Sequence, residues 1–363
     1  MRILAVLVVL ASMGSAWAQS MDSSVGQLKV EAFAQGLDEP WAIGFLPDGE
    51  VLITERDGRL LLRRAGGKII EVRHNLKLRA QGQGGLLDIM VPRDFETTRQ
   101  IFLSFSKRQG RGAGTALTVG KLSNDGTRLV NPRVIFELER GSSGGRHFGS
   151  RIVEGLDGTI FLTIGDRGDR ASAQDLSVEN GSVIRINPDG SIPADNPFAD
   201  RPGAQSEIWS YGHRNPQGAA LDVKGQLWTV EHGAAGGDEV NRIVAGANYG
   251  WPVISYGTHY SGKIGEGTAK AGMEQPDHFW DPSIAPSGMM IYSGKIWPEW
   301  KGDIFVGSLK FDYISRLSGT KLNEVEQLSG PETDRVRDIR EAPDGSIWYL
   351  SVGNGALYRI SPG

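Results

Sequence analysis

The segment 208–252 concentrates residue types that proteins place at binding sites. It reads IWSYGHRNPQG, then LWTVEHGAAGGDEVNRI, then GANYGWP. Arg214, Asn215 and Gln217 surround Pro216, and an Asn-Pro pair favours a turn because proline lacks an amide hydrogen. Three carboxylates lie near a run of glycines that exposes backbone carbonyls: Glu231, Asp238 and Glu239. A cation, amides and carboxylates on adjacent loops predict a site for an anionic ligand and a hard metal ion.

A histidine and a carboxylate form a second candidate group. His147 lies in the glycine-rich segment GGRHFGS before an expected strand, and Asp166 ends the next strand of the same hairpin, in IGDRG. Antiparallel pairing would bring the carboxylate to the imidazole. A carboxylate on one ring nitrogen fixes the tautomer and raises the basicity of the other nitrogen, as a general base requires. A structural histidine is the alternative that these residues leave open.

Three further segments supply candidate ligand-binding groups. Gln83 lies in QGQGGLLD, where glycines either let a ligand approach the backbone or form a β-bulge. Lys310 ends the expected strand FVGSLK. Arg335 and Arg337 alternate in RVRD and therefore face one side of an extended strand. Two like charges on one face are unfavourable unless an anion meets them; solvated side chains are the alternative for all four residues.

A recurring turn-and-strand unit has to position these side chains. Turns that close on glycine precede the runs VLITE, TIFLTIGD, QLWTV, DIFVGSL and SIWYLSV, and a looser turn precedes IFLSF. Asp-Gly before a run of apolar residues is a strong hairpin signal. The units recur roughly every 40 to 80 residues, which suits four strands and variable loops per unit. Six units predict an all-β, six-bladed β-propeller with a central channel; a sandwich or two β domains is the alternative.

Two features complete this expected architecture. The final run ALYRIS, at 356–361, is expected to pair with an early strand near LKVEAFA and so close the ring. The irregular segments 167–180 and 252–282 are expected to be loops over one face, and loops on a rigid scaffold often carry function.

The first 18 residues have the pattern of a secretory signal peptide. Arg2 supplies the positive start, ILAVLVVLA the apolar core, and Ala16-Trp17-Ala18 a small-residue cleavage site. The apolar run is shorter than the roughly 20 residues that span a membrane, although an uncleaved anchor is the alternative. We therefore expect a periplasmic or secreted protein whose residues 19–363 form one propeller domain.

Composition excludes several classes of site. The 363 residues include no cysteine, so disulfides and thiolate metal sites are excluded. The formal net charge of -4 gives no electrostatic case for nucleic-acid binding.

Taken together, these motifs resemble those of the soluble sugar dehydrogenases that depend on pyrroloquinoline quinone (PQQ), and the bacterial aldose sugar dehydrogenase branch most closely. The resemblance extends from about Leu37 to Ile360, and the fold of that family is a six-bladed propeller. The segments that carry it are GHRNPQG, EHG followed by GGDEVN, GANYGWP, QGQGGLLD, IGDRGD, SLK and RVRD.

The resemblance implies roles for individual residues. His147 matches the general base, Asp166 the carboxylate that orients it, and Arg214 a group that stabilises negative charge on the quinone oxygen. The residues that match the polar surroundings of the quinone are Gln83, Arg214, Asn215, Lys310, Arg335 and Arg337.

The resemblance also implies metal and substrate sites. The backbone carbonyls of Gly233 and Ala234 match those that hold a catalytic calcium ion, although the family more often has Gly-Pro at this pair. Glu239 and the carbonyl of Tyr249 match a second, structural calcium site. Trp280 matches an aromatic residue that lines the sugar pocket.

The implied activity is oxidation of an aldose at C1 to an aldonolactone, with hydride transfer to calcium-bound PQQ and an unidentified electron acceptor downstream. A calcium-dependent lactonase-type hydrolase is the second candidate, and it would need several acidic ligands converging on the channel. A non-catalytic sugar-binding propeller is the third. Either a monomer or a homodimer is compatible with the sequence.

Overall fold

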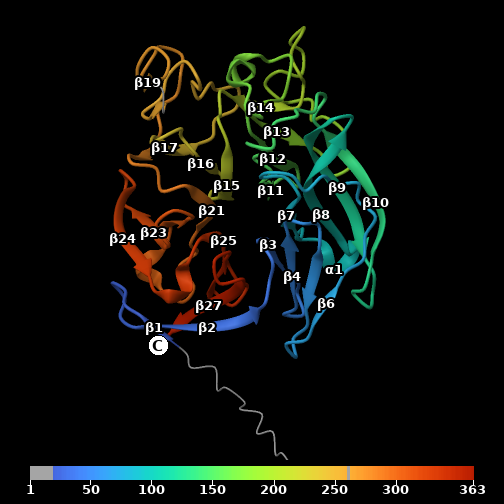
Figure 1. Ribbon diagram of the computed structural model, residues 1–363, viewed down its shortest axis with the longest axis vertical. Coiled ribbons are helices and arrows are strands. Elements are labelled where there is room, and N and C mark those ends of the chain that lie inside the picture. Colours follow the sequence, from blue (N-terminus) through green and yellow to red (C-terminus); the bar gives the residue numbers. More distant parts are fainter. Residues whose placement is uncertain (1–18, 260–261) are drawn as a thin grey trace, which may run out of the picture.

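Six antiparallel sheets surround a central axis in the computed structural model, which describes residues 19–259 and 262–363 (Figure 1). This arrangement confirms the predicted all-β, six-bladed propeller. The predicted signal peptide, residues 1–18, lies outside the described residues.

Blades one to three follow one another along the chain, each from its innermost to its outermost strand. Blade one contains β3 (Pro40–Phe45), β4 (Val51–Glu55), β5 (Leu60–Arg63) and β6 (Ile69–Glu71). Blade two contains β7 (Leu86–Met90), β8 (Gln100–Gln109), β9 (Gly112–Leu122) and β10 (Leu129–Glu137). Blade three contains β11 (Ile152–Glu154), β12 (Ile160–Ile164), β13 (Ser182–Ile186) and β14 (Ile208–Tyr211).

Blades four to six continue the same pattern. Blade four contains β15 (Pro216–Leu221), β16 (Leu227–Glu231), β17 (Asp238–Arg242) and β20 (His278–Trp280). Blade five contains β21 (Pro286–Ile291), β22 (Ile304–Ser308), β23 (Tyr313–Ser318) and β24 (Asn323–Ser329). Blade six contains β25 (Val336–Glu341), β26 (Ile347–Ser351), β27 (Ala356–Pro362), β2 (Leu28–Gln35) and β1 (Gln19–Met21).

Short elements lie in the connections. They are the helix α1 (Phe95–Thr98), the 3₁₀ turns η1 (Arg170–Gln174), η2 (Pro298–Trp300) and η3 (Pro331–Thr333), and the hairpin β18 (Thr258–His259) and β19 (Gly262–Lys263). In the described part of the chain, no helix is long and apolar enough to cross a membrane.

The N-terminal strand closes the ring. β2 pairs antiparallel with β27, with Val30 opposite Ile360, so the last blade is built from both ends of the chain (Figure 1). This pairing was predicted from the sequence. It joins the two ends of the chain in one sheet and covers the edge that β27 would otherwise expose.

The repeated apolar run is the second strand of every blade. VLITE is β4, IFLSF lies in β8, and the other four runs form β12, β16, β22 and β26. Every residue of β4, β22 and β26 is buried. These strands have a neighbouring blade on each face, which explains why they read as continuous apolar runs rather than alternating ones.

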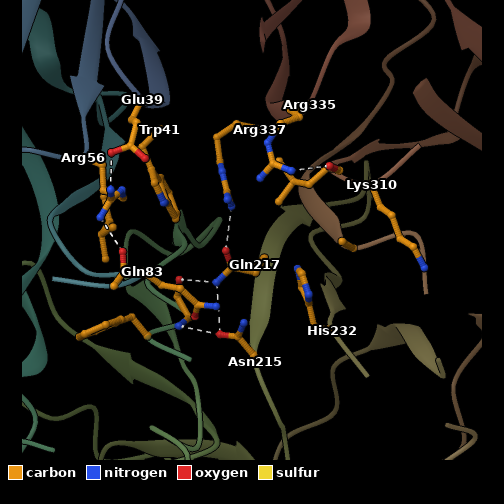
Figure 2. Close-up of a pocket in the computed structure, with 16 residues that line it drawn as sticks. Glu39, Trp41, Arg56, Gln83, Asn215, Gln217, His232, Lys310, Arg335 and Arg337 are labelled. Atoms are coloured by element: carbon orange, nitrogen blue, oxygen red, sulfur yellow. Dashed lines mark hydrogen bonds and ion pairs between the residues drawn. The ribbon is translucent and has the colours of Figure 1, made fainter. Parts of the chain in front are cut away.

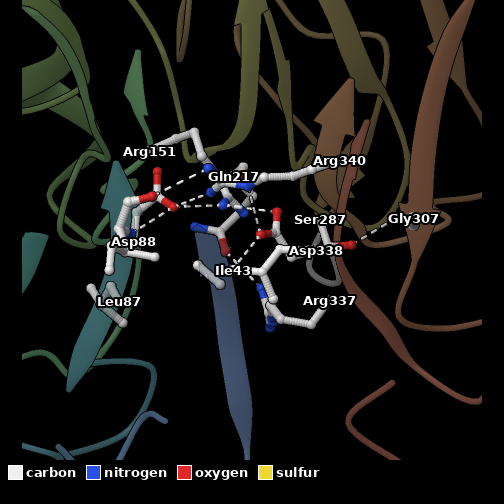
Figure 3. A network of polar contacts seen from close by, with 12 residues as sticks. Ile43, Leu87, Asp88, Arg151, Gln217, Ser287, Gly307, Arg337, Asp338 and Arg340 are labelled. Carbon is white, nitrogen blue, oxygen red and sulfur yellow. Dashed lines mark hydrogen bonds and ion pairs between the residues drawn. The ribbon is translucent and has the colours of Figure 1, made fainter. Parts of the chain in front are cut away.

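A network of buried charges crosses the channel axis (Figure 3). Arg151 Nη1 lies 3.0 Å from Asp88 Oδ1 and 2.9 Å from Asp338 Oδ1. Asp88 Oδ2 accepts a hydrogen bond of 2.7 Å from the Ile152 amide, and Asp338 Oδ2 accepts one of 3.1 Å from the Ile43 amide. Arg340 pairs with both aspartates. These contacts join blades one, two, three and six, and pairing removes most of the cost of burying the charges.

Candidate active site

A cavity of about 550 Å³ opens at one mouth of the channel (Figure 2). Its size is within the range of roughly 300 to 1,000 Å³ that is usual for ligand pockets. Five of the side chains predicted to surround a quinone line it, although they come from distant parts of the chain: Gln83, Asn215, Lys310, Arg335 and Arg337.

The propeller topology explains this convergence. The first strand of each blade lies at the axis, and all six first strands begin at the same mouth of the channel. The antiparallel second strands end at that mouth, so the loops before the first strands and after the second strands meet there. Gln83 precedes β7, Asn215 precedes β15, and Lys310 follows β22. Arg335 precedes β25, and Arg337 is its second residue.

Three cations on the cavity wall lack a carboxylate partner among the described residues, whereas Arg56 pairs with the acidic lining residue Glu39. Arg337 Nη1 donates a 3.0 Å hydrogen bond to Gln217 Oε1, and Arg335 Nη1 donates one of 2.9 Å to the Leu309 carbonyl. Among the described residues, neither arginine nor Lys310 makes an ion pair. Burial, together with the nearby cations Arg151 and Arg335, lowers the pKa of Arg337 to about 9. An anionic ligand would offset this crowding of like charge.

His147 and Asp166 meet beside this cavity. His147 precedes β11, Asp166 follows β12, and these two strands pair antiparallel as predicted. His147 Nδ1 lies 2.6 Å from Asp166 Oδ1, and the His147 amide donates a 2.7 Å hydrogen bond to Gln83 Oε1. The Asp166 side chain is fully buried, whereas that of His147 keeps 13% of its surface exposed.

The surroundings of the pair favour a neutral imidazole. Burial lowers the pKa of His147, and the nearby Arg214 lowers it further, against the opposing effect of Asp166. Burial alone would raise the pKa of Asp166, but hydrogen bonds from His147, the Gly168 amide and Trp251 keep that pKa below its ordinary value. The neutral ring can donate Nδ1–H to the carboxylate and present the lone pair of Nε2, which is the state of a general base.

Arg214 lies next to this pair, and its guanidinium makes no ion pair with a carboxylate of the described residues. Its Nη1 donates a 3.2 Å hydrogen bond to the His232 carbonyl, and the guanidinium carbon lies 5.3 Å from the centre of the Trp251 ring. Nε of Arg214 is buried and has no hydrogen-bond partner within the described part of the chain. A buried, unpartnered donor is costly, so this arrangement indicates that an acceptor belongs here.

Three of the four residues predicted to hold calcium line a second, much smaller cavity, and Ala234 does not. Gly233, Glu239 and Tyr249 line it together with Glu231 and Arg214. Glu231 and Glu239 are directly opposite each other on β16 and β17, and the side-chain Nδ2 of Asn241 donates to both, at 3.2 and 3.3 Å. Burial and the Glu231 carboxylate raise the pKa of Glu239 to about 8. Two facing carboxylates are unfavourable, and a cation would relieve their repulsion.

The loop 233–237 depends on its glycines. A side chain on Gly233 would collide with the carbonyl oxygens of Gly236 and Gly237. Ala234, in contrast, packs against the apolar cluster of Ala173, Trp251 and Ile264. Over residues 19–259 and 262–363 there is no group of three or more His, Cys, Asp or Glu side chains that could hold a metal, so an ion here would depend on backbone carbonyls.

Trp280, predicted to line a sugar pocket, does not line this cavity. It lies on β20, the outermost strand of blade four, where it is buried with Val240, Ile284 and Met289. Its Nε1 lies 3.3 Å from Glu324 Oε1. The fourth strand of a blade is farthest from the axis, so a side chain there packs between blades instead of reaching the mouth.

Sequence reasoning missed several residues of the site. Trp41, Arg56 and His232 line the cavity, and no local pattern marks them. Arg167 is almost fully buried, stacks on Phe148 at 3.3 Å and donates to the carbonyls of residues 144 and 146, so it holds the loop before His147 in place. Trp251 belongs to the recognised motif GANYGWP, but nothing in that motif indicates its contact with Asp166.

The chain is similar in sequence and fold to several known proteins. The family model described as Glucose / Sorbosone dehydrogenase matches residues 37–359. The aldose sugar dehydrogenase YliI of Escherichia coli K12 is 41% identical over 345 residues, which cover 92% of this chain and 93% of that protein. The apo-form crystal structure of the soluble aldose sugar dehydrogenase from Escherichia coli has a TM-score of 0.87 at 39% identity, covering 93% of this chain and 100% of that one. The PQQ-bound aldose sugar dehydrogenase of Streptomyces coelicolor has a TM-score of 0.76 at 25% identity, covering 92% and 98%.

Proposed function

The chain belongs to the glucose/sorbosone dehydrogenase family, and on that premise we propose that it oxidises aldose sugars at C1 to aldonolactones, with PQQ and calcium as cofactors. The observation that carries this proposal is the convergence of three cations without acidic partners beside a buried His147–Asp166 pair.

The cavity suits PQQ, a quinone that bears carboxylates. Lys310, Arg335 and Arg337 would hold the carboxylates, while Gln83 and Asn215 offer amide groups. Arg214 lines the second, smaller cavity and not this one, and its unpartnered Nε would supply a further donor at the boundary. When bound, PQQ supplies the two-electron acceptor that no amino-acid side chain provides.

The chain itself supplies a base and electrostatic stabilisation. In the proposed reaction, His147 Nε2 accepts the proton of the anomeric hydroxyl. Asp166, 2.6 Å from Nδ1, stabilises the imidazolium that forms. The buried guanidinium of Arg214 stabilises negative charge on an oxygen placed beside it, and such fixed charges act strongly where water is excluded.

Calcium suits the oxygen-rich loop 233–239. The backbone carbonyls of Gly233 and Ala234 would hold the catalytic ion, which would act as a Lewis acid. Alanine is compatible with this role because a main-chain oxygen makes the bond. The facing carboxylates Glu231 and Glu239, with the carbonyl of Tyr249, would hold a second ion.

The same observations disfavour the other two candidates. A lactonase-type hydrolase would need free acidic ligands on the channel axis, but Asp88 and Asp338 are engaged by arginines there. In a non-catalytic propeller, nothing would require a buried aspartate that is hydrogen-bonded to His147. We further propose that the protein is exported, on the basis of the signal pattern in residues 1–18.

The proposal is tested by reconstitution. PQQ and calcium are added to the purified apo-protein, and reduction of a redox dye is followed with several aldoses. We expect aldose-dependent reduction that requires both additions. In the variant His147→Ala, PQQ should still bind and quench tryptophan fluorescence, but turnover should be lost. His74→Ala is the matched control, because His74 bonds to the Gly58 carbonyl and lies outside the cavity. No reduction with any aldose, or full activity in His147→Ala, would contradict the assignment.

A further inference from the structure

We propose that Trp251 is a positioning residue that holds Asp166, and through it His147, in the orientation that catalysis needs, while its ring supports Arg214. This inference rests on the proposed function, because it concerns the general base of that reaction. It adds a residue for which the sequence indicated no role.

The contact between Trp251 and Asp166 is direct and buried. Trp251 Nε1 donates a 2.8 Å hydrogen bond to Asp166 Oδ2, and both side chains are buried. The other oxygen, Oδ1, receives the His147 ring and the Gly168 amide, at 2.6 and 2.7 Å. Among the described residues, Trp251 is therefore the only donor to Oδ2, and without it one oxygen of a buried carboxylate would lack a partner. The indole therefore prevents the Asp166 carboxylate from rotating about its Cβ–Cγ bond.

The chain around Trp251 is itself held in place. Its amide donates a 2.8 Å hydrogen bond to the Gly212 carbonyl, and its carbonyl accepts one of 2.8 Å from Gln174 Nε2. Gln174 also exchanges hydrogen bonds with Asn248, at 2.9 and 2.8 Å. Gln174 lies in η1, shortly after Asp166, so these bonds tie the loop of Trp251 to the segment that carries the carboxylate.

The face of the same indole lies against Arg214. The guanidinium carbon is 5.3 Å from the ring centre, within the distance at which a cation is attracted to an aromatic face. Trp251 thus contacts two of the three side chains assigned to the reaction, through its edge and its face. A change here should affect the base and the arginine together.

Replacing Trp251 with phenylalanine removes the N–H donor and retains most of the ring. The carboxylate of Asp166 loses one of its stabilising hydrogen bonds, becomes more basic, and so stabilises the His147 imidazolium more strongly. The charged groups that face His147, namely Asp166, Arg146 and Arg214, are all retained. The neighbouring His232 is also retained, and burial lowers its pKa to about 3, so it stays neutral in the range of the titration. We expect the pKa of His147 to rise by about 0.5 unit or more, and kcat to fall about 5- to 50-fold because the carboxylate can rotate.

The experiment combines two readouts. The pH dependence of kcat/KM is measured for wild type and Trp251→Phe, and the His147 imidazole is titrated by ¹H–¹⁵N NMR in the protein without cofactor. His147→Ala identifies the signal among the six histidines. The control is Trp300→Phe, which removes a buried indole donor to Ser24 in another blade and should change neither readout.

The outcomes separate positioning from packing. A Trp251→Phe variant that is less thermostable but keeps the wild-type His147 titration and kcat would overturn the proposal. If Trp251→Phe does not fold, Gln174→Met takes its place, because it frees the Trp251 loop and keeps the indole. This variant should shift the His147 titration in the same direction by a smaller amount. An unchanged titration in Gln174→Met would equally refute the proposal. The NMR titration needs no turnover, so it tests Trp251 even if the wild-type protein fails the dehydrogenase assay.

Discussion

Asp166→Asn is the substitution whose outcome follows most directly from the geometry. Three donors converge on this buried carboxylate: His147 Nδ1 and the Gly168 amide on Oδ1, and Trp251 Nε1 on Oδ2. An asparagine amide has one acceptor oxygen and one donor nitrogen. In one arrangement, the asparagine NH₂ faces the Trp251 Nε1 donor. In the other, the NH₂ faces the Gly168 amide and donates to His147 Nδ1, which then has to be the acceptor. The second arrangement places the proton on Nε2, which then cannot act as a base.

The expected magnitude follows from these contacts. A hydrogen bond to a charged partner contributes about 1.5 to 3 kcal/mol, which corresponds to about 10- to 150-fold in rate if it is lost when the imidazolium forms. The fraction of molecules with the wrong tautomer lowers kcat further. Two donors facing each other in a buried site should also lower the free energy of unfolding by about 1 to 3 kcal/mol. Because Asp166 raises the pKa of His147, the acid limb of the residual activity should move to lower pH.

Reconstituted wild type and variant are compared by dye reduction across pH, by urea unfolding and by PQQ titration. PQQ affinity should change little, because Asp166 does not line the cavity. Asp175→Asn is the matched control, since Asp175 lies in the same segment and bonds to the Ser177 amide. A kcat within about threefold of wild type, or an acid limb that moves to higher pH, would refute the reasoning.

Four other predictions follow from the same contacts. Arg337→Gln should weaken PQQ binding about 10- to 150-fold in a fluorescence titration, because one cation on the cavity wall is lost; unchanged affinity would place the quinone elsewhere. For wild type, the midpoint of the acid limb of kcat/KM should lie below pH 6.5, because burial lowers the pKa of His147 and the base is active only above its pKa; a midpoint above pH 7 would be inconsistent with this. Asp338→Asn should lower the free energy of unfolding in urea by about 3 kcal/mol or more, since it leaves Arg151 and Arg340 with one buried carboxylate between them; a loss below 1 kcal/mol would contradict a stabilising axial network. Chelation with EDTA should lower the melting temperature and calcium should restore it. Glu239→Gln should reduce the difference in melting temperature between the calcium-loaded and the chelated protein. If neither EDTA nor calcium changes the melting temperature, the second ion is not present.

The sequence was sufficient for features that depend on neighbouring residues. Five of the six blades have a glycine turn before the second strand, and in all six that strand is an apolar run because it has a neighbouring blade on each face. These runs predicted the number of blades. The pairing of His147 with Asp166 could also be predicted, because both residues flank one hairpin, β11 and β12. The closing contact of β2 with β27 was also predicted, because pairing of the last run with an early one would close the ring.

Only the tertiary structure decided what meets around the axis. Which connections share one mouth depends on the direction of all six first strands, so Trp41 and His232 could not be assigned to the cavity. The position of Trp280 on the outermost strand of blade four, away from that cavity, was likewise not evident from its motif. The tie from Trp251 to Asp166 spans two blades and 85 residues, and the axial network joins carboxylates and arginines from distant strands. Hydrogen bonds across such separations leave no periodic pattern in the chain, because each partner satisfies a geometry that exists only once the ring has closed.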